Sequence, residues 1–207
     1  MTKALVALAL SMVGLLAQPA PPVGAKPANI VLANDKLELT IGVNGGTFLR
    51  LLLRGGEPVS PFAAMGHFLA LDGFGAASAE ERAAGMPGHG EANRTLMKVV
   101  DARESGPVRS ATLQGWFPLA QETLTRKVEI ADGENVVCVT SDLESALAID
   151  RPVSWAEHAT LGPPFLEPGK VTIDMPATRC RVRAERAGST GKLAYLRDFD
   201  WPMAPLT

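Results

Sequence analysis

The stretch Lys36-Leu-Glu-Leu-Thr-Ile-Gly-Val-Asn-Gly-Gly46 contains the two signals that decide the fold class. Its apolar residues alternate with polar or small ones, which is typical of a strand with one buried face; they are Leu37, Leu39, Ile41 and Val43. Asn44, Gly45 and Gly46 then supply residues that readily adopt positive φ, and an apolar run resumes at residues 47–53. This stretch predicts an antiparallel hairpin.

The same two signals recur along the chain. Residues 123–131 and 135–143 are predicted to form a second hairpin, joined through Asp132-Gly133. Further strands are expected at residues 97–103, 108–116, 171–175, 178–184 and 193–199, whereas only residues 77–84 suggest a helix. Many short strands with closely spaced turns predict an all-β domain, an antiparallel sandwich or barrel.

The N-terminal residues have the pattern of an export signal. Lys3 precedes a nearly unbroken apolar run from residue 4 to 17, and Val23-Gly24-Ala25 fits a small-residue cleavage site. The apolar run is shorter than the roughly 20 residues that span a bilayer. We therefore expect a signal peptide at residues 1–25, one domain at residues 26–207, export to the periplasm or the extracellular space, and no stable membrane insertion after cleavage.

Charge and cysteine content limit the choice of partners. The net charge is −2 and the isoelectric point is about 5.9, so the basic surplus that nucleic-acid binding requires is missing. Cys138 and Cys180 are the only cysteines. Export would permit a disulfide between them, but both lie in apolar strand-like runs, where two buried thiols are an equal alternative.

The segment Trp155-Ala-Glu-His-Ala-Thr-Leu-Gly-Pro-Pro-Phe-Leu-Glu-Pro-Gly169 is the first candidate for function. It places His158 beside an acidic residue and continues into a turn rich in Gly and Pro, which we interpret as a positioned loop. A second His lies in Gly85-Met-Pro-Gly-His-Gly-Glu-Ala-Asn-Arg94, within a long connection from residue 72 to 94. His89 is bracketed by Gly residues, so a ligand could approach it closely, and Arg94 adds a cation with several donors.

Together these segments resemble the galactose mutarotase-like family, which includes aldose 1-epimerases and hexose-6-phosphate epimerases. Four pieces occur in the family's order over roughly residues 30–207: Gly66-His-Phe-Leu-Ala-Leu-Asp-Gly-Phe-Gly75, Pro87-Gly-His-Gly-Glu91, Glu157-His-Ala-Thr-Leu-Gly-Pro-Pro-Phe165 and Leu196-Arg-Asp-Phe-Asp-Trp-Pro202. The third piece is the most specific. The resemblance implies a large antiparallel β-sandwich, the galactose mutarotase-like supersandwich, that binds an aldohexose or a derivative without a cofactor or metal.

In catalytic members of that family a central His donates a proton to the ring oxygen of the sugar, a Glu removes the proton of the anomeric hydroxyl, and the ring opens and recloses. By this resemblance His158 matches the proton donor and His89 the other active-site His, while Arg94 is a looser match. An imidazole suits the acid role because it changes protonation near neutral pH. Contacts to the sugar are further expected from Phe165, Asp198 and Trp201.

The chain departs from the family in one respect. The family's catalytic Glu lies well beyond the central His, but this sequence stops at Thr207 without that motif. Either the sandwich is incomplete at its C-terminus or the base is missing. Glu157 and Glu91 are weak substitutes, because neighbours on a strand point to opposite faces and Glu157 would then not share a pocket with His158.

Other chemistries are less consistent with the sequence. The three His residues occur singly, without the paired spacing of a zinc site, so no metal is expected. No nucleophile elbow, phosphate-binding loop or Cys-x-x-Cys pair occurs. The predicted function is that of a carbohydrate-binding, aldose 1-epimerase-like protein, an isomerase when complete. The alternatives are a carbohydrate-binding module without turnover and a purely structural domain; the sugar and the oligomeric state stay open.

Overall fold

A computed structural model describes residues 29–174, 176–183 and 192–207, so the predicted signal peptide at residues 1–25 lies outside the described residues. The chain divides into two compact units, the first ending at Leu161 and the second running from Gly162 to Thr207. Each unit is described by itself.

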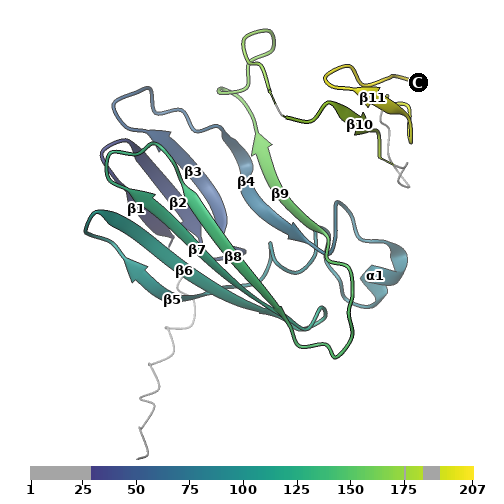
Figure 1. Ribbon diagram of the computed structural model, residues 1–207, viewed down its shortest axis with the longest axis horizontal. Coiled ribbons are helices and arrows are strands. Elements are labelled where there is room, and N and C mark those ends of the chain that lie inside the picture. The colour runs from purple at the N-terminus through teal and green to yellow at the C-terminus, as the bar shows by residue number, and fades with distance from the viewer. Residues whose placement is uncertain (1–28, 175, 184–191) are drawn as a thin grey trace, which may run out of the picture. The chain divides into compact units, whose positions relative to one another are not determined.

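The first unit contains a five-stranded antiparallel sheet, and His158 lies on one of its strands. Its strands are β1 (Ile30–Ala33), β2 (Leu37–Gly42), β3 (Thr47–Leu53), β4 (Phe62–Leu71) and β9 (Trp155–Leu161), in the order β1-β2-β3-β4-β9. The last strand is remote in sequence from its neighbour: β9 pairs with β4, as Figure 1 shows.

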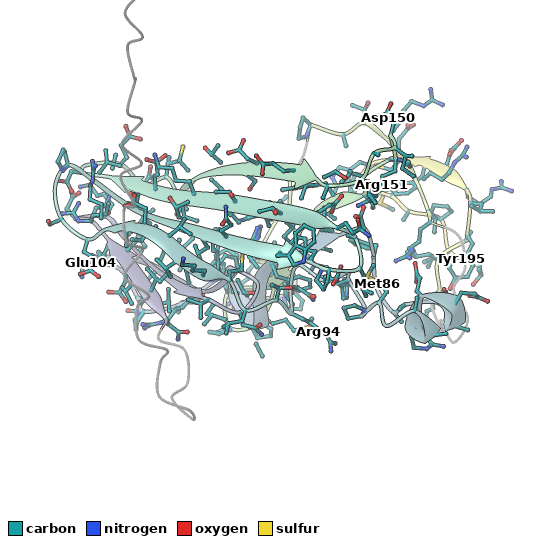
Figure 2. The ribbon with its side chains drawn as sticks, turned by 90° about the horizontal axis from the view of Figure 1, so that it is seen from below. Met86, Arg94, Glu104, Asp150, Arg151 and Tyr195 are labelled. Atoms are coloured by element: carbon teal, nitrogen blue, oxygen red, sulfur yellow. The ribbon has the colours of Figure 1, made fainter. Side chains whose placement is uncertain are left out.

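A second antiparallel sheet consists of four strands in sequence order. They are β5 (Lys98–Arg103), β6 (Val108–Phe117), β7 (Glu122–Ala131) and β8 (Cys138–Ser145). The inward side chains of the two sheets share one core, formed mainly by Leu32, Leu39, Ile41, Leu69, Leu113, Leu124, Val128 and Ile130. The two sheets lie as two layers in Figure 2. The first unit is therefore nearly all-β and sandwich-like, in agreement with the predicted fold class.

Both predicted hairpins are confirmed. In β2 the residues Leu37, Leu39 and Ile41 are buried, and β2 pairs antiparallel with β3 across a turn in which Gly45 and Gly46 have φ of 70° and 61°. Strands β7 and β8 also pair antiparallel, with Glu129 opposite Cys138. The connection between them is longer than predicted, because β8 begins at Cys138 rather than at residue 135.

The predicted short helix is α1 (Ala79–Ala83). Ser78 caps it: its hydroxyl accepts a hydrogen bond from the Glu81 amide, and its own amide donates to the Glu81 carboxylate. This reciprocal pair satisfies two amides that a helix start leaves without partners.

The second unit contains less regular structure than predicted. Its described strands are β10 (Arg179–Arg181) and β11 (Asp198–Asp200), which pair antiparallel and are shorter than the strands expected at residues 178–184 and 193–199. The strand prediction at residues 171–175 is wrong for residues 171–174, which form no strand. Cys138 and Cys180 are both unpaired, and Cys138 is exposed rather than buried.

The interpretation of residues 155–169 as a positioned loop is wrong for residues 155–161. Trp155–Leu161 forms β9, and the turn begins at Gly162, whose carbonyl accepts a hydrogen bond from the Leu166 amide. His158 therefore lies on a paired strand inside a sheet.

Candidate functional site

The pairing of β4 with β9 decides where the two central side chains point. Phe68 lies opposite His158, and Leu69 lies opposite Glu157. Because successive side chains of a strand point to opposite faces, His158 shares one face of the sheet with Phe68. Glu157 points to the other face, where its carboxylate meets His67. The expectation that Glu157 and His158 do not share a pocket is confirmed.

On the outer face of this sheet, His158 and His89 come together with two Phe rings, and we call these four residues the two-histidine cluster. The ring centroids of His89 and His158 are 5.3 Å apart and the rings are nearly perpendicular, at 89°. Phe68 stacks on His158 at 4.5 Å and meets the edge of His89 at 5.2 Å. Phe74 lies 6.0 Å from both imidazoles and is 44% exposed. Two segments far apart in sequence therefore form one site.

The loop that carries His89 is held by its backbone. His89 has φ of 65°, and the next residue, Gly90, has φ of 76°. A Cβ placed on Gly90 would lie 1.7 Å from the carbonyl oxygen of Leu71, so only glycine fits there. The His-Gly pair thus allows the loop to lie directly against the end of β4.

Hydrogen bonds fix the His89 ring in a defined state. The His89 amide donates to the Gly75 carbonyl at 2.9 Å, and the Gly75 amide donates to Nδ1 of His89 at 3.2 Å. Because Nδ1 accepts, a neutral His89 carries its proton on Nε2. His158 is positioned by its stacking on Phe68 and by the Thr160 hydroxyl, 3.3 Å from its Nδ1.

Glu157 belongs to a charge network on the inner face of the sheet. Its two carboxylate oxygens each accept a hydrogen bond from the Arg126 guanidinium at 2.9 Å, and one of them also lies 2.9 Å from Nε2 of His67. Burial alone would raise the pKa of Glu157, but the hydrogen bonds from His67 and Arg126 outweigh it and lower that pKa to about 2. Such a carboxylate stays ionised at neutral pH and is a poor general base.

Glu91, the other substitute considered for the base, has a structural role. Its carboxylate accepts hydrogen bonds from the amides of Leu119 and Ala120, at 3.1 Å and 2.9 Å. We call the connection from residue 72 to 94, which carries His89 and Gly90, the His-Gly loop. The two hydrogen bonds hold the end of this loop against the β6–β7 connection. Neither Glu157 nor Glu91 is thus in place to act on a ligand at the two-histidine cluster.

Of the other predicted site residues, one lies in the first unit and three lie in the second unit. Arg94 is exposed and extends away from the sheets in Figure 2. Phe165, Asp198 and Trp201 belong to the second unit, where Phe165 is exposed and Asp198 accepts two hydrogen bonds from Arg181. This ion pair lowers the pKa of Asp198.

A buried group of charges anchors the start of the His-Gly loop. One Arg151 nitrogen donates to both Asp72, which follows β4, and Glu122, the fully buried first residue of β7. Burial and the neighbouring Asp72 charge raise the pKa of Glu122. Burial also opposes ionisation of Asp72, but hydrogen bonds from Arg151 and the Ser154 amide lower its pKa. The group ties the ends of β4, β7 and the β8–β9 connection together.

Sequence reasoning missed several residues that shape these sites. Phe68 and Phe74 lie inside the quoted segment from Gly66 to Gly75, and their spacing around Asp72 gave no sign of contact with His158. Arg126 has the same parity in β7 as the buried Leu124 and Val128, so the alternation places it on the inward face, where its side chain is only 2% exposed. Its burial depends on Glu157, a partner that sequence spacing does not reveal.

No family model matches this chain, and a search of the curated proteins finds no match. Within the part of the chain that the structure describes, no three His, Cys, Asp or Glu side chains are grouped so as to hold a metal ion. No helix among the described residues is long and apolar enough to cross a membrane.

Proposed function

We propose that the protein binds a carbohydrate at the two-histidine cluster and that its β-sandwich is of the galactose mutarotase-like kind. The observation that carries the proposal is the convergence of His89 and His158, whose ring centroids are 5.3 Å apart. The family resemblance assigns His158 and His89 to one active site, and their proximity is consistent with that assignment.

The chemistry of the cluster suits a sugar. Two perpendicular imidazoles offer a donor and an acceptor in different directions, as neighbouring hydroxyl groups require. The partly exposed ring of Phe74 supplies an apolar surface on which the C–H face of a pyranose can stack. Positioned polar groups beside an aromatic surface are typical of small-molecule sites.

For turnover we propose the aldose 1-epimerase reaction, with His158 giving a proton to the ring oxygen. With its proton on Nε2, His89 would hold a hydroxyl or the ring oxygen by a hydrogen bond. The reaction also needs a base for the anomeric proton. The two carboxylates considered for this role are engaged elsewhere, Glu157 with Arg126 and Glu91 with the amides of Leu119 and Ala120.

That last observation favours a second candidate, recognition of the sugar without turnover. In this case the cluster would bind one anomer or both and leave their interconversion unchanged. The two candidate functions share the site and differ only in whether the protein raises the rate of anomer interconversion.

Two measurements on the same samples separate them. Isothermal titration calorimetry with a panel of aldohexoses, including glucose and galactose, measures binding, and polarimetry of α-glucose and α-galactose measures anomer interconversion. We expect His158→Ala and His89→Ala to weaken binding at least 10-fold. Trp116→Ala, which removes an aromatic ring that is 49% exposed on β6, is the matched control and should bind like the wild type.

Each outcome decides between the candidates. Faster interconversion that His158→Ala abolishes supports the epimerase. Binding without acceleration supports the recognition module. If no sugar of the panel binds, or if both His variants bind like the wild type, the proposed site is wrong. His158→Gln, which keeps a polar side chain on β9, should repeat the result of His158→Ala if the imidazole itself is needed.

A further inference from the structure

We propose a second ligand site, independent of the carbohydrate site: a cavity between the two sheets that binds a small, uncharged, mainly hydrophobic molecule carrying an acceptor oxygen. The cavity has a volume of about 530 Å³ and lies on the inner face of the five-stranded sheet. Its apolar walls come from both sheets and from the connection before β8, with Leu39, Leu51, Phe62, Val137, Val139 and Trp155 as the main side chains.

The cavity has a closed floor and an open mouth. Leu39 and Phe48 at its base are 0% and 6% exposed, whereas Val139 on β8 and Trp155 on β9 are 38% and 40% exposed. A volume of this size is within the usual range for ligand pockets, and walls of aliphatic and aromatic side chains favour an apolar occupant. The mouth lies where β8 and β9, each an end strand in the strand order of its sheet, face solvent.

The polar side chains of the cavity neutralise one another. Arg126 and Glu157 form two hydrogen bonds of 2.9 Å, and His67 completes the network on the same carboxylate. Phe48 stacks on His67 at 5.3 Å and lies under the Arg126 guanidinium at 5.5 Å. A charged ligand would have to compete with an ion pair whose charges already match and whose Arg126 side chain is buried, so an uncharged ligand is favoured.

One donor in the network is unsatisfied. Nε of Arg126 is buried and has no hydrogen-bond partner among the described residues, although the whole side chain is only 2% exposed. A buried N–H without a partner is costly, because it has given up its hydrogen bonds to water. Nε has less than 1 Å² of accessible surface, so the Arg126 side chain must shift for a carbonyl, ether or ester oxygen of a ligand to supply the missing acceptor.

The site is separate from the two-histidine cluster because the two use opposite faces of β9. Glu157 lines the cavity, and the next residue, His158, belongs to the cluster. Binding in the cavity should therefore be independent of His158.

The test uses Prodan, an uncharged naphthalene ketone whose fluorescence rises and shifts to the blue in apolar surroundings. We expect saturable binding of one Prodan per chain. Val139→Trp, which fills the mouth, should weaken binding at least 10-fold, whereas Val136→Trp, at an exposed position that does not line the cavity, should not. Leu51→Trp and its control Leu53→Trp repeat the comparison on β3, where Leu53 is 58% exposed. Far-UV circular dichroism confirms that each variant is folded.

Three results would overturn the proposal. Unchanged Prodan binding by both Val139→Trp and Leu51→Trp would place the probe elsewhere. Equal or tighter binding of the anionic probe anilinonaphthalene sulfonate would contradict the preference for an uncharged ligand. Loss of Prodan binding as the protein concentration rises, together with dimer formation in light scattering, would show that a second copy of the chain covers the cavity. His158→Ala should leave Prodan binding unchanged, and a parallel loss there would contradict the independence of the two sites.

Discussion

Removing the Glu157 carboxylate should cost more stability than its partly exposed position suggests. The perturbation is Glu157→Leu, which takes both hydrogen-bond partners from the Nη atoms of Arg126. Arg126 is only 2% exposed, so its charge would be left almost without solvent or counter-ion. Breaking a buried ion pair from one side typically costs about 3–5 kcal/mol. The Glu157 side chain is 36% exposed, so water can reach the vacated space, and we expect about 3 kcal/mol.

The pKa of Glu157 provides a second estimate of the same interaction. A shift from 4.5 to about 2, at about 1.4 kcal/mol per pKa unit, corresponds to about 3.5 kcal/mol before solvent screening. Since more than a third of the side chain is exposed, roughly half of that remains, about 1.5–2 kcal/mol. This smaller value applies to Glu157→Gln, which loses the charge but keeps a hydrogen-bonding group.

The assay is urea unfolding followed by far-UV circular dichroism at several pH values. Because the folded protein lowers the pKa of Glu157, its contribution is fully present above pH 4.5 and is lost as the pH falls towards about 2. The difference between wild type and Glu157→Gln should therefore be largest near neutral pH and vanish at the acid end. The double variant Arg126→Leu/Glu157→Leu should recover most of the stability, because no buried charge remains.

Two results would refute this reasoning. A Glu157→Leu protein within about 0.5 kcal/mol of the wild type would show that Arg126 does not depend on Glu157. A double variant that is less stable than Glu157→Leu would show that shape, rather than charge pairing, dominates at this position.

Three further predictions concern the supports of the two-histidine cluster. Gly90→Ala should destabilise the protein by more than about 2 kcal/mol and weaken sugar binding, because its Cβ would lie 1.7 Å from the Leu71 carbonyl oxygen. The control is Gly106→Ala, because Gly106 also has a positive φ but a Cβ there meets nothing within 4 Å. Equal losses of stability for the two variants in urea unfolding would argue against the close approach at Gly90. Glu91→Ala should cost about 1–3 kcal/mol in the same assay because the amides of Leu119 and Ala120 lose their acceptor, and an effect within error of zero would contradict that role. The pKa of Glu122 is raised in the folded protein, so folding disfavours its ionised form. The wild type should therefore lose stability relative to Glu122→Gln as the pH rises above 4.5. A stability difference between the two proteins that does not change with pH would show that folding does not shift the pKa of Glu122.

The hairpins could be predicted from the sequence because their signals are local. The alternation in β2 and the turn residues Gly45 and Gly46 act over a few residues, so no distant partner is needed to interpret them. The capped helix α1 is local in the same way. Strands β4 and β9 were missed because Gly66, His67 and the Ala residues of β9 have weak intrinsic strand preference. Their strand state depends on pairing with each other.

The sites show the same division between local and distant information. His89 and His158 were singled out because Gly and Pro residues mark their segments, and the resemblance assigned both to an active site, whereas their contact is known only from the structure. The opposite orientations of Glu157 and His158 followed from the two-residue period of a strand. The inter-sheet cavity and the pairing of Arg126 with Glu157 could not be predicted, because both depend on which face of one sheet meets which face of the other.

The central claim is that a sugar binds between His89 and His158, and it can be tested without any variant. Long-range ¹H–¹⁵N correlation spectra resolve the imidazole nitrogens, and this chain has only three His residues. On titration with the aldohexose panel, the account predicts that signals of both His89 and His158 shift together with one dissociation constant, while His67, on the opposite face of the sheet, stays in place. If the signals of all three His residues stay in place, or if only the His67 signals shift, the account is contradicted.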